Sequence, residues 1–307
     1  MNKLLFKLIV FLLFVFLTGE VIVRLAKLTA DIPQRFVDET GIQRYIPGQS
    51  GYLARSDYKW VVNDYGWIGK ADTSNSENII SIVGDSFIEN IMNPISCNQG
   101  TLLGSYYKNI SFFEAGRSGV TFIESMEITK LLDTTIAPRK HLLYIGKGGL
   151  YKSISNKQRF TDAIQLDLEK KSILKGKLKY PKLKYILYNI KLLYYLYIKF
   201  PLLVSDQNKG EIVNKLAKRK EIDLNSVNEL FQYCNDNYNM NNIIFVIRPG
   251  VKKEIIKLAK EFEFKMIVLN SEGDKSWGLG NHDGHWSCYG HDQAAKQIQT
   301  HLKLLIE

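Results

Sequence analysis

Short, wholly apolar runs alternate with helix-compatible stretches along much of the chain. Because short apolar strands that alternate with helices are typical of buried parallel strands, the pattern predicts a three-layer α/β/α fold with a central parallel sheet. In such sheets the functional loops lie at the carboxyl ends of the strands. The expected strands are Asn78–Val83, Ile110–Phe113, His141–Ile145, Ile243–Ile247 and Lys265–Leu269, and the expected helices are Thr121–Leu132, Leu224–Tyr238, Val251–Phe262 and Gly290–Ile306.

The amino terminus is strongly apolar. Between Leu4 and Val23, 16 of 20 positions are apolar, and Lys3 and Lys7 lie at or near the start. We expect residues 1–25 to form an uncleaved transmembrane signal anchor, because cleavage after Gly19 would place the bulky Leu17 at a position that requires a small residue. Early lysines favour a cytoplasmic amino terminus and hence an extracytoplasmic body. A cleaved signal and a buried or amphipathic first helix remain alternatives.

Two further segments interrupt the regular pattern. Residues 26–76 read as a linker followed by irregular β structure, with a hairpin turn at Asn63–Gly66. Residues 151–222 read as an insertion, helical around Pro181. The parts on either side of it, 77–150 and 223–307, then form one α/β domain.

The insertion also holds most of the chain's net charge. Residues 170–199 contain nine lysines, six tyrosines and no acidic residue, whereas the whole 307-residue chain has a formal net charge of +10. The basicity therefore belongs to one segment, which argues against a nucleic-acid-binding fold. Lysines mixed with tyrosines suit an anionic membrane surface or an acidic glycan, and a merely solvated helical lid is the other interpretation.

Composition narrows the class of protein. Apolar residues make up 45% and charged residues 23%, which excludes a disordered chain and a polytopic membrane protein. Three widely spaced cysteines (Cys97, Cys234 and Cys288) exclude a disulfide scaffold and disfavour a zinc ribbon.

Candidate chemistry begins at the end of the first strand, which leads into Gly84-Asp85-Ser86. A strand–turn–helix arrangement would expose Ser86 to a ligand near a helix amino terminus, where a developing oxyanion is stabilised. Asp85 is expected to hold the turn through backbone amides. A turn serine is the alternative for Ser86 taken alone.

The carboxyl-terminal region supplies a base for this serine. Residues 281–291 include Asp283 and His285, two positions apart, so that the carboxylate can orient the imidazole while the imidazole accepts a proton from Ser86. His282, Asp283 and His285 could instead be metal ligands, but no further ligand-rich motif supports that interpretation, and we expect neither a metal nor a cofactor.

Together these motifs resemble the SGNH (GDSL-type) hydrolases, whose fold is flavodoxin-like, and in particular the membrane-anchored subgroup that includes the alginate O-acetyltransferases. The resemblance covers roughly residues 77–150 and 235–305. It implies a nucleophile at Ser86, a base at His285 and an orienting acid at Asp283.

One block departs from the family pattern. The third block usually reads Gly-x-Asn-Asp, and here Gly146-Lys147-Gly148-Gly149 lacks the Asn that donates to the oxyanion. The second block carries Arg117, which we expect to substitute for it, together with the backbone amides of Ser86 and Gly116.

The expected function is ester hydrolysis or O-acyl transfer on acyl esters of a cell-envelope carbohydrate. The expected acyl group is acetyl. The membrane is the other expected partner, through the first helix and the 170–200 segment. The alternative is a catalytically inactive glycan-binding or assembly protein that keeps the fold.

Overall fold

The computed structural model describes residues 3–54, 57–75, 77–160, 162–200, 223–280 and 283–306. Contacts divide the chain into two compact units, each described separately below. Unit 1 comprises Met1–Gln34, Ser50–Lys59 and Tyr180–Glu221, and unit 2 comprises Arg35–Gln49, Trp60–Lys179 and Ile222–Glu307.

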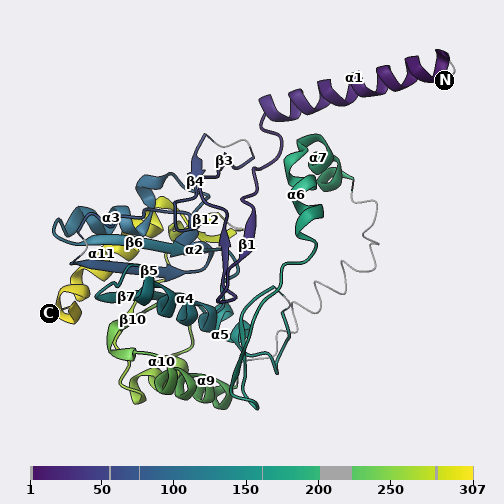
Figure 1. Cartoon of the computed structure of the whole chain (residues 1–307). Coiled ribbons are helices and arrows are strands. Elements are labelled where there is room, and N and C mark those ends of the chain that lie inside the picture. The colour runs from purple at the N-terminus through teal and green to yellow at the C-terminus, as the bar shows by residue number, and fades with distance from the viewer. Residues whose placement is uncertain are drawn as a thin grey trace. The chain divides into compact units, whose positions relative to one another are not determined.

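A five-stranded parallel sheet forms the centre of unit 2 (Figure 1). Its strands, in spatial order, are β11 (Met266–Val268), β10 (Ile243–Ile247), β7 (Lys140–Ile145), β5 (Ile79–Gly84) and β6 (Ser111–Gly116). These are the five strands that the apolar runs predict, with small shifts at their ends. Because all five run in one direction, their carboxyl ends lie along the same edge of the sheet.

Helices cover both faces of this sheet, because alternate residues of each strand point to opposite sides. On β5, Ile79 and Val83 belong to one hydrophobic cluster, whereas Ile80 and Ile82 belong to the other. The first face packs against α4 (Phe122–Thr135), α5 (Lys147–Ser153), α9 (Leu224–Asn237) and α10 (Lys253–Glu261); the second packs against α2 (Ser86–Glu89), α3 (Gln99–Tyr106) and α11 (Cys288–Ile306). The three-layer α/β/α prediction is confirmed.

Smaller elements complete unit 2. The turn expected at Asn63–Gly66 is present, since the Gly66 amide donates to the Asn63 carbonyl and the Asn63 amide to that of Trp67. The short elements are β1 (Arg35–Val37), β2 (Gln43–Tyr45), β4 (Lys59–Val61), η1 (Ile95–Cys97), β8 (Gln165–Asp167), β9 (Ser172–Leu174), η2 (Met240–Asn242), η3 (Lys275–Trp277), β12 (Gly278–Gly280) and β13 (Asp283–Trp286).

Unit 1 contains the apolar first helix, α1 (Lys3–Leu25), with β3 (Ser50–Tyr52), α6 (Pro181–Asn189) and α7 (Lys191–Lys199). At 23 residues, α1 is about 35 Å long, enough to cross a bilayer core, so it could be a membrane anchor or a signal sequence. The Glu20 carboxylate accepts the amides of Lys191 (3.0 Å) and Leu192 (2.7 Å), the first two residues of α7. Part of the basic segment therefore forms a helix, α7, that docks on α1.

Candidate active site

Ser86 lies at the carboxyl edge of the sheet, on the turn between β5 and α2. The Asp85 carboxylate accepts the Phe87 amide (3.1 Å) and caps α2, as the sequence indicates. A Cβ atom on Gly84 would lie 2.6 Å from Ile88 Cγ1, so the tight return of the chain onto α2 requires glycine there. The turn leaves the Ser86 side chain half-buried at the start of the helix.

Asp283 and His285 come from β13 and meet Ser86 across 199 residues of sequence. His285 Nε2 lies 2.7 Å from Ser86 Oγ, and His285 Nδ1 lies 2.6 Å from Asp283 Oδ1. The His285 backbone amide donates to the same carboxylate oxygen at 3.0 Å. Residues two apart on a strand share a face, which lets one short strand supply both groups. The three side chains form a continuous hydrogen-bond chain.

The charge distribution in this chain suits proton transfer. Hydrogen bonds from the backbone amide and the imidazole of His285 hold the pKa of Asp283 below its ordinary value, so this carboxyl stays ionised into acid solution. An ionised Asp283 keeps the proton on Nδ1 and leaves Nε2 free to accept one from Ser86. The His285 side chain is 32% exposed and that of Asp283 is 48% exposed, so a substrate can reach them.

A disulfide that the sequence did not predict lies next to this strand. Cys97, the last residue of η1, is bonded to Cys288, the first residue of α11 and the third after His285. Nearby, Asn93 Nδ2 donates to the Trp286 carbonyl at 2.9 Å. The segment that follows α2 is thus tied to the strand that carries the base. Cysteines 191 residues apart leave no local sequence pattern from which to recognise the pair.

Behind the strand, His291 belongs to a buried polar network. Gln99 Nε2 donates to the His291 carbonyl (2.8 Å), and the Tyr144 hydroxyl donates to Gln99 Oε1 (2.9 Å). Burial, together with the nearby His285, lowers the pKa of His291 to about 3. His291 is therefore neutral at ordinary pH and packs against Trp286, with ring centroids 5.3 Å apart.

Gly116 lies beside the turn that leads into Ser86, whereas the Arg117 side chain is engaged elsewhere. Gly116 pairs in register with Gly84, and a Cβ atom on it would lie 2.3 Å from the Glu89 amide nitrogen. The buried Arg117 guanidinium is paired with Glu124 and donates to the Ser118 carbonyl (2.9 Å). This geometry gives Arg117 a structural role in place of the direct oxyanion contact expected from the sequence, because its carboxylate partner in α4 holds it.

Arg248 is a site residue that sequence reasoning missed. It follows β10 directly, and its Nη2 donates to the Asp85 carboxylate at 2.9 Å. Its guanidinium carbon lies 3.7 Å from the centroid of the Phe87 ring. An arginine after an apolar strand carries no motif, and it reaches Asp85 only because one strand, β7, separates β10 from β5 in the sheet.

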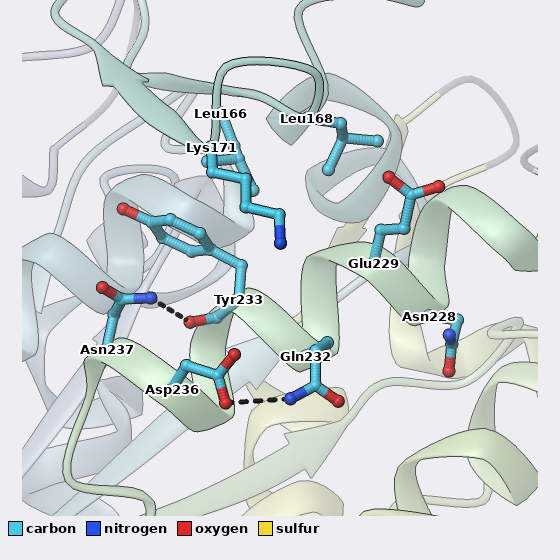
Figure 2. A pocket seen from close by; sticks show the side chains of 9 residues that line it. All are labelled: Leu166, Leu168, Lys171, Asn228, Glu229, Gln232, Tyr233, Asp236 and Asn237. Atoms are coloured by element: carbon cyan, nitrogen blue, oxygen red, sulfur yellow. Dashed lines mark hydrogen bonds between the residues drawn. The ribbon is translucent and has the colours of Figure 1, made fainter.

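Two cavities differ in their relation to these residues. One, of about 270 Å³, is lined by Phe87, Lys147, Arg248, Gly284 and Trp286, among others, and so adjoins the Ser86–His285–Asp283 chain. The other, of about 340 Å³, lies between α9 and the β8–β9 hairpin (Figure 2). Three of its polar side chains are paired within α9, where Gln232 donates to Asp236 and Asn237 donates to the Tyr233 carbonyl. The first cavity is the candidate substrate site.

A second Ser–His–Asp arrangement is present in the core. Ser81 Oγ lies 2.6 Å from His141 Nδ1, and His141 Nε2 lies 2.9 Å from Asp133 Oδ1. Ser81 is fully buried in the middle of β5 and His141 is 1% exposed. No substrate could reach this serine, so the arrangement serves to satisfy buried polar groups.

In the described part of the chain, no group of three or more His, Cys, Asp or Glu side chains is placed to hold a metal ion. His282, the remaining member of the alternative metal set, lies outside the described residues.

Comparison with solved structures finds esterases and lipolytic proteins among the matches. The chain is similar to the psychrotrophic esterase EstA from Pseudoalteromonas sp., with a TM-score of 0.40 and 11% identity over 74% of this chain and 97% of that one. It is also similar to a member of the lipolytic G-D-S-L family from Veillonella parvula, with a TM-score of 0.38 and 11% identity over 73% and 96%. No family model and no curated protein matches the sequence. With TM-scores of 0.40 and 0.38 these matches carry no argument, and the chemistry rests on the site residues themselves.

Proposed function

We propose that this protein is a serine-dependent esterase or O-acyltransferase of the SGNH type. The observation that carries the proposal is the unbroken hydrogen-bond chain from Ser86 through His285 to Asp283, at 2.7 and 2.6 Å, at an accessible sheet edge. A hydroxyl becomes a nucleophile when an oriented base accepts its proton, and this chain supplies both the base and the group that orients it.

The reaction proceeds through an acyl-enzyme. His285 Nε2 accepts the Ser86 proton as Oγ attacks the acyl carbonyl, and the imidazolium formed is stabilised by Asp283. The Ser86 amide has no intrahelical acceptor, because it is the first amide of α2. It donates to the oxyanion together with the backbone amide of Gly116. His285 then protonates the leaving alcohol. Water or a second alcohol next attacks the acyl-enzyme, and that choice separates an esterase from a transferase.

We propose acetyl esters of cell-envelope carbohydrate as the substrate and the extracytoplasmic face of the membrane as the location. Two features support the location. A disulfide such as Cys97–Cys288 persists in oxidising compartments, and α1 is long and apolar enough to anchor the chain. Within unit 1, α6 and α7 expose Leu183, Ile186 and Ile198 among their lysines, which suits contact with an anionic bilayer surface.

A pair of matched serine variants tests the mechanism. We expect Ser86→Ala to abolish labelling by a fluorophosphonate probe and to lower release of 4-nitrophenol from 4-nitrophenyl acetate by at least about 10³-fold. Ser81→Ala removes a serine with the same kind of His–Asp partners, but in the inaccessible core, and should retain labelling. Folding of both variants is checked by circular dichroism. Labelling that survives in folded Ser86→Ala would eliminate the serine mechanism.

The same probe separates an enzyme from a non-catalytic glycan-binding module. An activated Ser86 reacts with the fluorophosphonate, whereas a binding module that merely keeps the fold does not. For an active protein, a panel of carbohydrate alcohols added to the acetyl ester distinguishes transfer, which yields an acetylated acceptor, from hydrolysis, which yields acetate alone.

A further inference from the structure

Arg248 has buried hydrogen-bond donors without partners. Its side chain is 9% exposed, and only Nη2 is bonded, to Asp85. No acceptor among the described residues lies within hydrogen-bonding distance of Nε or Nη1. Leaving buried charged donors unpaired costs free energy, so native proteins rarely do so without a functional reason.

Arg248 is one of the residues that line the cavity of about 270 Å³ beside the Ser86–His285–Asp283 chain. Its Nε and Nη1 atoms are themselves buried, so the guanidinium acts on the cavity through its charge. Phe87, which follows Ser86, stacks on the guanidinium, and Gly284, which lies between Asp283 and His285, forms another part of the wall. A ligand group bound at Arg248 would therefore belong to a molecule whose ester is at Ser86.

The surroundings are arranged to hold this guanidinium and to keep the cavity positive. A Cβ atom on Gly146 would lie 1.8 Å from Arg248 Nη2, so only glycine leaves room for the side chain. Asp85 balances the charge of Arg248, and the exposed Lys147 adds a positive charge at the same cavity. No Asp or Glu is among the described residues that line it.

We propose that this cavity is an anion subsite, and that the substrate carries an anionic oxygen group, a carboxylate or a phosphate, near its ester. The positive charges of Arg248 and Lys147, which both line the cavity, attract the oxygens of that group. The substrate statement rests on the proposed esterase function, whereas the anion subsite can be tested without turnover.

Binding to the Ser86→Ala variant of the full chain, in detergent, is the test. Trp277 and Trp286 line the cavity, so their fluorescence reports a nitroaromatic ligand bound there. Two ligands of nearly the same shape are compared: 4-nitrobenzoate, which is anionic, and 4-nitrobenzamide, which is neutral. We expect the anion to quench saturably with at least about tenfold higher affinity. A parallel titration with 4-nitrophenyl phosphate shows whether phosphate is preferred to carboxylate.

Variants tie the effect to the cavity. Arg248→Gln should remove the preference for the anion, and Arg248→Lys should restore part of it. Because Arg248 also holds Asp85, Lys147→Gln provides a second variant at an exposed position, and it should weaken anion binding several-fold, as expected for one partly screened charge. Lys130→Gln, on exposed α4 surface, is the control for loss of a charge elsewhere.

Equal affinities for the anion and the amide, or a preference unchanged in both Arg248→Gln and Lys147→Gln, would overturn the subsite. Fluorophosphonate labelling of the wild-type protein is read separately. Labelling without a preference for the anion would refute the subsite and leave the esterase proposal intact. A preference for the anion without labelling would refute the esterase proposal and leave the subsite intact.

Discussion

Removal of the Cys97–Cys288 disulfide should destabilise the fold and loosen the active site together. The bond joins the end of η1 to the start of α11 across 191 residues, so it restricts a long loop of the unfolded chain. In the chain-entropy description, closing a loop of that length stabilises the native state by about 5 kcal/mol. Small proteins have a total stability of only about 5–15 kcal/mol, so the expected loss is a large part of it.

The perturbation is the pair Cys97→Ala and Cys288→Ala, which avoids leaving one unpaired thiol. Urea denaturation followed by tryptophan fluorescence gives the free energy of unfolding for wild type, for wild type with a reductant, and for the double variant. We expect the last two to agree, and to lie well below the oxidised wild type. Cys234→Ala is the matched control, because Cys234 is buried and not in a disulfide. The free energy of unfolding of this variant should still fall when reductant is added.

Labelling of Ser86 provides a second measurement of the effect of removing the disulfide. His285 lies three residues before Cys288, and the Asn93 bond to the Trp286 carbonyl does not involve either cysteine, so we expect the double variant to retain it. We therefore expect the folded variant to label with fluorophosphonate more slowly than wild type, but still at Ser86. A free energy of unfolding that does not respond to reductant would show that the reasoning about this bond is wrong.

Two further predictions concern carboxyl groups. Asp283→Asn should lower the rate of ester turnover by about 10³–10⁴-fold while circular dichroism stays unchanged, because an amide cannot stabilise the imidazolium or fix the tautomer of His285; a loss below tenfold would contradict this role. Burial raises the pKa of Glu89 above its ordinary 4.5, although Tyr45 and Ser118 donate hydrogen bonds to its carboxyl group. As pH rises, the unfolded chain therefore loses the Glu89 proton before the folded protein does. The free energy of unfolding should therefore fall as pH rises from near 4.5 towards the raised pKa, by up to about 1.4 kcal/mol per unit, and Glu89→Gln should flatten that slope in urea denaturation; parallel slopes would contradict it.

The strands and the meeting of Ser86, His285 and Asp283 could be predicted because their signals are local. A run such as Ile243–Ile247 is buried on both faces, so its composition alone identifies a central parallel strand. Ser86 follows the end of an apolar strand, and His285 lies in a polar segment before the last helix. Both features can be recognised in the sequence. The rule that parallel strands gather their carboxyl ends at one edge favours placing them together without coordinates.

The features that escaped prediction are long-range pairings. Arg117 reads as a free cation in the sequence, but its partner Glu124 lies on the next helix, one turn after the Thr121 cap, and withdraws it from the site. Arg248 reaches Asp85 only because of the strand order in the sheet. The disulfide forms only because the end of η1 meets the start of α11. None of these has a signature in spacing, because each depends on which elements the folded sheet places side by side.

The two Ser–His–Asp arrangements of unit 2 differ in exposure, which is why only one of them is proposed to be catalytic. The serine–histidine distances are nearly the same, 2.7 Å for Ser86 and 2.6 Å for Ser81, so geometry between the groups does not decide. Ser81 is the third residue of β5, flanked by β6 and β7, and no carbonyl could approach it. Ser86 is two residues beyond the end of the same strand, beside a cavity that Arg248 and Lys147 line. Exposure at the end of the strand is therefore what makes Ser86, and not Ser81, the serine that a substrate could reach.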